Sequence, residues 1–376
     1  MSTLNELVGD AKIVVTCGPG GIGKTTSAAA MGVAIARHED RRVLVLTVDP
    51  AKRLATALGL EGIGNDIGRV SLDGARGELS VAMLDTQASW DSLIRRHAPD
   101  AGTATKILNN TLYQNITRRF VQSHDYIAVE RLFEIVEMNE FDVIVVDTPP
   151  SRNALDFLDA PSRMADFFSS RFLKWLIAPS RTGLATVATK PLTFIADKIL
   201  GGQFLSDITE FFLLLNSMHD GFIARAREID AILHQNSTQF VVVSTLEDQP
   251  LREAEQFAVE LKKRSLHTVA WIVNRVVPEK LLLPGDQSDH DDLVHRLEEI
   301  PEPRRSAVVA MVERNRDYWI RVALREQESL ARIADYGLDL FTVPEQAGDM
   351  TDLAALSTLG DVVMRSAVRR AGTTDA

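Results

Sequence analysis

The chain has 376 residues, of which 45% are hydrophobic and 25% charged, and its formal net charge is −11. This balance excludes a wholly disordered chain, and no run of basic residues is long enough to suggest a nucleic-acid partner. The single cysteine, Cys17, excludes an internal disulfide and fits a reducing compartment. The first residues lack the charge and apolar core of a signal peptide, so we expect a cytoplasmic location, either free or peripheral at a membrane.

Short apolar runs predict the strands of a sheet. They do not alternate with polar residues, which is typical of parallel strands buried on both faces. Helical stretches separate most of them, as in a doubly wound α/β fold. In chain order, the predicted strands are Ile13–Cys17, Val43–Val48, Leu79–Leu84, Val143–Val146, Phe240–Ser244, Val269–Val273 and Leu338–Val343.

Two long segments carry no strand signal. Residues from about 86 to 139 and from about 160 to 235 are rich in helix-forming and apolar residues. We expect them to form a helical subdomain inserted between sheet strands of a single domain that spans residues 1–376. A stretch rich in proline and aspartate, from residue 278 to 305, predicts an exposed loop.

The first predicted strand leads directly into a glycine turn. Residues 18–26 read Gly-Pro-Gly-Gly-Ile-Gly-Lys-Thr-Thr and match the P-loop pattern G-x-x-x-x-G-K-[ST]. Such a loop binds phosphate through backbone N–H groups and the following helix N-terminus. Lys24 would reach the β- and γ-phosphates, and Thr25 would ligate Mg²⁺. The predicted nucleotide-binding residues of this loop are Gly20, Gly21, Ile22, Gly23, Lys24, Thr25 and Thr26.

The motif predicts the fold class as well as the ligand. We expect a P-loop NTPase with a doubly wound, mostly parallel sheet of seven or eight strands and an attached helical subdomain.

Asp49 follows the second predicted strand and precedes Pro50. A carboxylate at the end of a strand could orient or deprotonate the water that attacks the γ-phosphate, and could also approach the metal ion. The pair Asp-Pro is equally suited to start the helix that follows. The local sequence leaves both roles open.

Asp147 ends the run Asp-Val-Ile-Val-Val-Asp and precedes Thr148-Pro149-Pro150. Four apolar residues and an aspartate form the pattern of a Walker B strand, whose carboxylate holds Mg²⁺ directly or through water. The alternative is an aspartate that only caps a turn.

A missing motif indicates which base the bound nucleotide carries. The chain lacks the Asn/Thr-Lys-x-Asp string by which P-loop GTPases read guanine, and a late strand ends instead in Asn274-Arg275. An asparagine amide offers one donor and one acceptor face, which matches the N6 and N7 edge of adenine. We therefore expect ATP, with Mg²⁺, as the nucleotide.

These motifs together resemble the ArsA-type ATPases, a family that includes the arsenite-pump ATPase and the ATPases that target tail-anchored membrane proteins. The strings Gly-Gly-Ile-Gly-Lys-Thr-Thr, Thr-Val-Asp-Pro-Ala-Lys, Val-Asp-Thr-Pro-Pro-Ser and Ile-Val-Asn-Arg occur in the family's order. The resemblance implies that Asp49 orients the hydrolytic water beside Lys24, and that Asp147, Thr148 and Pro150 belong to switch II. It also implies that Asn274, Val343 and Pro344 flank the adenine.

The chain also departs from the family pattern. The signature lysine, which reaches the partner's nucleotide across a dimer, is replaced by Pro19, and Lys52 and Arg53 follow the Asp-Pro-Ala motif. Either Lys52 or Arg53 takes over the role of that lysine within this chain's own assembly, or a sister subunit with the lysine supplies it. The paired cysteines that clasp the targeting ATPases are missing, and one cysteine cannot supply three thiolates for arsenite. The overall pattern is closer to the bacterial homologues of this family, some of which look like paired subunits.

The second helical segment contains many large apolar residues. The resemblance implies a groove for a hydrophobic client or membrane protein there. An ordinary core or a subunit interface explains the same residues, and only Met164 and Met218 supply adaptable methionines between residues 157 and 222.

Three functions therefore compete. The leading hypothesis is an Mg²⁺- and ATP-dependent switch that hydrolyses ATP and couples nucleotide state to dimer conformation and to a partner or cargo. The alternatives are the energising subunit of an anion or metalloid transporter, and a low-turnover nucleotide-binding subunit of a hetero-oligomer. We expect a homodimer or a heterodimer, with a paralogous P-loop subunit as the favoured partner, and no nucleic acid.

Overall fold

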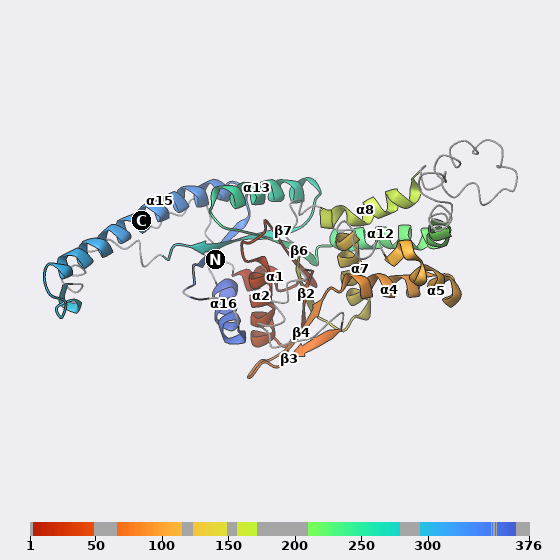
Figure 1. Cartoon of the computed structure of the whole chain (residues 1–376), viewed down its shortest axis with the longest axis horizontal. Coiled ribbons are helices and arrows are strands. Elements are labelled where there is room, and N and C mark those ends of the chain that lie inside the picture. Colours follow the sequence, from red (N-terminus) through yellow and green to blue (C-terminus); the bar gives the residue numbers. More distant parts are fainter. Residues whose placement is uncertain are drawn as a thin grey trace.

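The computed structural model describes residues 3–48, 66–114, 123–148, 156–170, 210–278, 294–346, 348, 350 and 352–365. A sheet occupies the middle of the molecule, a group of helices extends from one end of it, and one long helix projects from the other end (Figure 1).

The described residues contain one sheet of eight strands in the order β3-β4-β2-β5-β1-β6-β7-β8. Every neighbouring pair is parallel except β3 with β4. The predicted fold class is therefore confirmed. The strands are β1 (Ile13–Cys17), β2 (Arg42–Thr47), β3 (Ile67–Val70), β4 (Glu78–Met83), β5 (Val143–Asp147), β6 (Thr238–Ser244), β7 (Thr268–Val276) and β8 (Asp339–Pro344).

All seven predicted strands are present, and β3 is the one that the sequence did not reveal. It has only four residues and pairs antiparallel at the edge of the sheet. Its sequence, Ile-Gly-Arg-Val, has just two strongly apolar side chains, and only Val70 is buried. A short edge strand has no need of a continuous apolar run, so the signal used for the other strands is weak there.

Helices cover both faces of the sheet and also extend beyond one end of it (Figure 1). They are α1 (Leu4–Val8), α2 (Lys24–His38), α4 (Thr86–His97), α5 (Ala101–Asn109), α7 (Ser123–Met138), α8 (Asp156–Ser169), α12 (His219–Leu233), α13 (Asp248–Lys263), α15 (Arg304–Ala334) and α16 (Leu353–Arg365). A further helical stretch covers residues 210–216.

Alternate residues of the central strands divide the core into two layers. Val14 and Val43 pack on the side of α1, α2 and α16, whereas Val15 and Leu44 pack on the side of α7 and α13. Helices α2 and α16 lie close together, because a Cβ on Gly360 would stand 2.4 Å from the Ala30 carbonyl oxygen. Burial on both faces explains why these strands read as continuous apolar runs.

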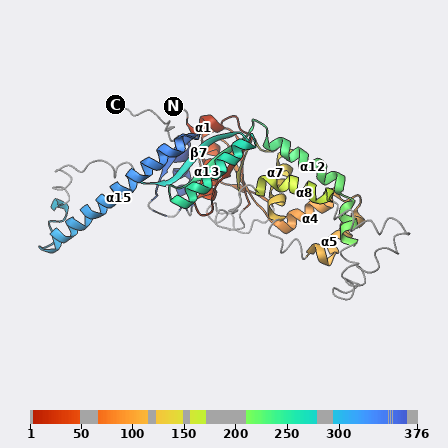
Figure 2. The ribbon, with the colours of Figure 1, turned by 90° about the horizontal axis from the view of Figure 1, so that it is seen from above.

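The helical group contains α4, α5, α7, α8 and α12, which lie side by side beyond one end of the sheet (Figure 2). In chain order, α4, α5 and α7 stand between β4 and β5, and α8 and α12 stand between β5 and β6. The described parts of both predicted segments are thus helical, while residues 115–122 and 171–209 lie outside the described residues. The division into one domain with an inserted subdomain stays a prediction.

A buried ion pair joins two of these helices. Arg225 of α12 donates from Nε to Glu130 of α7 over 3.0 Å, and its guanidinium lies 4.0 Å from the centre of the Phe133 ring. Burial raises the pKa of Glu130, and the charge of Arg225 opposes that rise. Phe211 of the stretch 210–216 is buried next to Tyr113, in one hydrophobic cluster with residues of α4 and α7. The described part of the group therefore has the packed interior of a core.

None of the helices formed by the described residues combines the length and the apolar character needed to cross a bilayer.

Candidate nucleotide site

The predicted site residues gather at the carboxyl edge of the sheet. The P-loop follows β1, the central strand between β5 and β6. Asp147 ends β5, and Asn274 lies near the end of β7. Ligands of open α/β sheets bind at this edge, where neighbouring connections leave to opposite faces.

The glycines of the P-loop are required by its geometry. Gly18, Gly21 and Gly23 have φ values of 146°, 79° and 94°, a region that side chains disfavour. A Cβ on Gly18 would lie 2.1 Å from the Val243 carbonyl oxygen, so the loop presses directly on β6. The close approach leaves room for glycine alone.

The P-loop ends at the start of a helix. Gly23 is the N-cap of α2, and no side-chain hydrogen bond caps this end among the described residues. Ile22 is buried in the core and anchors the loop. The N-terminal N–H groups of α2, including those of Thr25 and Thr26, therefore form the kind of end that binds anions.

Lys24 is held within the loop. Its side chain is buried, and its Nζ donates to the Pro19 carbonyl oxygen over 2.7 Å. A buried ammonium beside helix N–H groups produces a positive potential, which suits a polyphosphate.

Three oxygen-bearing side chains meet beside the P-loop. Thr25 donates from Oγ1 to Oδ2 of Asp147 over 2.7 Å, and Thr47 donates to the same oxygen over 2.9 Å. Asp147 has no exposed surface. Hydroxyl and carboxylate oxygens are the ligands that Mg²⁺ prefers, so Thr25 and Asp147 fit the predicted metal role.

Thr47 was not predicted from the sequence to be a site residue. It stands at the end of β2, opposite Asp147 in the strand register. The only available signal was a hydroxyl residue two positions before the Asp-Pro pair.

Two further threonines brace the neighbouring strand ends. Thr148 donates to the Thr16 carbonyl oxygen over 2.8 Å, and Thr16 donates from Oγ1 to the Val146 carbonyl oxygen over 3.1 Å. These contacts tie the start of the predicted switch II to β1.

Asn274 connects the P-loop to β7. Its Nδ2 donates to the Ile22 carbonyl oxygen over 2.8 Å, and its Oδ1 accepts from the backbone N–H of Arg275 over 3.0 Å. A Cβ on Gly23 would stand 2.4 Å from this Nδ2. A primary amide has two N–H donors and two acceptor lone pairs. After these two hydrogen bonds, the Asn274 side chain can still donate one and accept one hydrogen bond from a base.

The backbone around Asn274 is irregular. Arg275 has a φ of 60° and sits where the register between β7 and β8 shifts. Asn274 pairs with Val343, and Val276 pairs with Pro344, so the predicted adenine residues lie on adjacent strands. The Arg275 side chain is exposed. Strain of this kind is concentrated at functional sites.

A buried hydroxyl lies next to Asn274 in the sheet. Ser244 pairs with Val273, so the residues that follow, Thr245 and Asn274, are neighbours across β6 and β7. Thr245 is buried, and its Oγ1 has no hydrogen-bond partner in the described part of the chain. Thr245 is not among the site residues predicted from the sequence.

Cys17 lies below the site. Its thiol donates to the Val241 carbonyl oxygen over 3.3 Å, and burial raises the pKa of the thiol. The side chain is therefore a neutral part of the core between β1 and β6.

Asp49, Lys52, Arg53 and Pro150 lie outside the described residues. The predicted role of Asp49 in orienting water thus stays a prediction.

The comparisons identify the family to which the chain belongs. The family model described as "Anion-transporting ATPase", ArsA_ATPase, matches residues 11–284. The chain belongs to this family, and the predictions of an ArsA-type ATPase and of ATP-hydrolysing enzyme activity are confirmed.

Curated relatives agree with this placement. The chain is similar to "ATPase ASNA1 homolog" of Entamoeba dispar, with 23% identity over 71% of this chain and 77% of the relative. It is 26% identical to "ATPase get3" of Aspergillus terreus, over 73% and 74% of the two chains. It is 24% identical to "Putative arsenical pump-driving ATPase 2" of Aquifex aeolicus, over 70% and 79%.

Proposed function

We propose that this ATPase is a Mg²⁺- and ATP-dependent switch subunit that acts in the cytoplasm and pairs with a second P-loop subunit. The observation that carries the proposal is the convergence of Thr25 and Thr47 on one oxygen of Asp147. This cluster links the nucleotide loop to the ends of β2 and β5. Binding or loss of the γ-phosphate would therefore alter the contacts at both strand ends.

The P-loop residues have separate tasks in this proposal. Glycine N–H groups and the start of α2 bind the phosphates, and Lys24 neutralises the β- and γ-oxygens. Thr25 and Asp147 would hold Mg²⁺, which supplies charge neutralisation at the transferred phosphate. Asp49 orients the attacking water, as the resemblance implies. Asn274, Arg275, Val343 and Pro344 form the adenine end.

Pro19 favours a division of labour between two subunits. Its ring has no charge, and its carbonyl oxygen is the acceptor for Lys24. A cation supplied from a partner stabilises the charge that develops on the transferred phosphate. We infer that a sister subunit with the signature lysine supplies it, which makes the isolated chain slow.

The helical group is the proposed partner-binding part. In this proposal, nucleotide binding is coupled to the helical group through the chain, because α8 follows the residues after β5 and α12 precedes β6. Whether it takes a hydrophobic client or a membrane partner is tested by mass analysis of what co-purifies with the native protein.

The direct test compares the wild-type chain with Lys24→Ala and Arg252→Ala. Arg252 is exposed on α13 and serves as a matched control for the loss of one cation. Isothermal titration and phosphate release with ATP should show loss of both binding and turnover in Lys24→Ala alone. Nucleotide affinity within a factor of two of wild type in that variant would refute the site.

A further inference from the structure

Helix α15 continues far beyond the sheet. It has 31 residues, and its C-terminal third packs on the body through Leu330, Ile333 and the pair of Arg332 with Glu255. The rest extends away as a single helix (Figures 1 and 2). Residues 304–325 are called the arm below.

One hydrogen bond fixes where the arm leaves the body. Glu326 accepts from the backbone N–H of Val277, the residue that follows β7. Because the strand has ended at Val277, the 22 residues before Glu326 extend past the carboxyl edge of the sheet, by about 33 Å at 1.5 Å per residue. This is the edge that holds the P-loop and Asn274.

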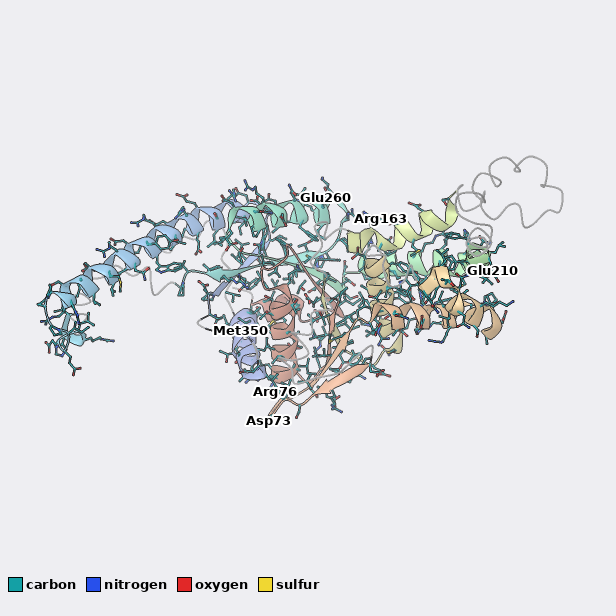
Figure 3. All side chains as sticks on the ribbon, viewed as in Figure 1. Asp73, Arg76, Arg163, Glu210, Glu260 and Met350 are labelled. Atoms are coloured by element: carbon teal, nitrogen blue, oxygen red, sulfur yellow. The ribbon has the colours of Figure 1, made fainter. Side chains whose placement is uncertain are left out.

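The arm presents an apolar and basic face. Met311 and Tyr318 are 57% and 50% exposed, and Arg314 and Arg321 are exposed between and after them. Their spacing of three, four and three residues places all four on one side of the helix. The buried Val309 and Ala323 lie on the opposite side. Side chains project all around this part of α15, clear of the sheet (Figure 3).

The arm's charge is opposite to that of the rest of the chain. Residues 304–325 contain six arginines, one glutamate and one aspartate, which gives a net charge of +4. The whole chain carries −11, so the remaining residues carry −15. The rest of a second copy therefore carries a net charge opposite to that of the arm.

We propose that the arm is a clasp that binds the body of a second copy of this chain across the nucleotide edge. Met311 and Tyr318 supply the apolar contact, and Arg314 and Arg321 supply charge complementarity. The exposed aromatic and arginine side chains are of the types that dominate interfaces. The inference goes beyond the pairing proposed above, because its partner is a second copy of this chain and not a sister subunit with the signature lysine, and it does not depend on ATP turnover.

The single cysteine makes the contact measurable. Because Cys17 is buried, Met311→Cys and Tyr318→Cys each add the one accessible thiol of the chain. Each variant is labelled with a benzophenone maleimide and irradiated at a concentration where sedimentation detects dimer. Val259→Cys on α13, where Val259 is 39% exposed, is the matched control.

We expect a cross-linked product of twice the chain mass from both arm positions and not from Val259→Cys. The double variant Arg314→Glu/Arg321→Glu should raise the dimer dissociation constant at least tenfold, whereas Arg252→Glu should leave it unchanged. The wild-type dimer should weaken with salt, because exposed charges are screened.

Three results would overturn the clasp. They are a monomer at every concentration, a dimer that no arm position cross-links, and binding of the arm to phosphatidylserine vesicles in place of a second copy. ATP hydrolysis measured on the same samples separates this failure from a failure of the ATPase assignment. Circular dichroism shows whether the double variant is folded, and the cysteine variants test the contact independently of charge.

Discussion

The hydroxyl of Thr25 lies 2.7 Å from a carboxylate oxygen of Asp147, although 122 positions separate the two residues in the chain. Thr25 stands at the start of α2, which follows β1, and Asp147 ends β5, the strand that pairs with β1. The contact brings the P-loop and the Walker B strand together as one polar cluster.

Asp49→Asn should keep ATP binding and lose hydrolysis by a factor of about 10² or more, the usual contribution of a positioned base or water-orienting group. Asparagine keeps the capping ability and removes the charge. Single-turnover phosphate release and ATP titration measure the two properties separately. A near wild-type rate would show that Asp49 only starts a helix.

Asn274→Ala should weaken ATP binding more than GTP binding. A bidentate contact to a base contributes about 1–3 kcal/mol of discrimination, and the amide also ties the P-loop to β7. The measurement is the ratio of ATP to GTP dissociation constants for wild type and variant. If both constants rise by the same factor, Asn274 acts only as a brace of the loop.

Gly23→Ala should reduce nucleotide affinity at least tenfold. The new Cβ would stand 2.4 Å from Nδ2 of Asn274, at a φ of 94° that alanine disfavours. Gly74→Ala is the matched control, since Gly74 also has a positive φ but has open space around its Cβ position. Equal loss of nucleotide affinity in both variants would assign the effect to backbone strain alone.

A sister subunit that carries the signature lysine should raise the ATPase rate of this chain. The charge that accumulates on the transferred phosphate is only partly neutralised by Lys24, and Pro19 adds no cation. The assay titrates a lysine-bearing homologue into the chain, with a lysine-to-alanine homologue as control. Full activity of the chain alone, unchanged by either homologue, would contradict the division of labour.

Asp142 should make the fold sensitive to acid. Its carboxylate accepts from the backbone N–H and guanidinium of Arg42, which lowers its pKa to about 2 from 3.8. A carboxyl group whose pKa is lower in the folded than in the unfolded protein stabilises the fold at pH values above its ordinary pKa. This stabilisation is lost as the pH falls from 3.8 toward 2. The group is partly exposed, so we expect about 1 kcal/mol or less.

The matched variant for this prediction is Asp142→Asn, which keeps an oxygen acceptor. Its urea midpoint should lie below that of wild type at pH 7, and the difference should shrink near pH 2. A constant difference between the two pH values would show that the charge of Asp142 contributes nothing.

The sequence by itself determined the sheet and the nucleotide loop. Strands such as Val143–Asp147 are buried on both faces, so their apolar runs are readable without knowledge of their neighbours. The P-loop is equally local, because its glycines, Lys24 and Thr25 follow one another in the chain. The edge strand β3 was the exception, since a partly exposed strand needs little apolar surface.

Only the tertiary structure decided which side chains meet. The roles of Thr47 and Thr148 depend on the register of β2, β5 and β1, which no local pattern encodes. The arm is a similar case: its arginines and apolar residues are ordinary in sequence. The direction in which they project is set by the hydrogen bond between Glu326 and the backbone N–H of Val277, at the end of β7. This contact joins residues 49 positions apart. The periodicity of a sequence indicates which face of a helix or strand is apolar. Which residues far apart in the sequence come into contact is decided by the packing of these elements.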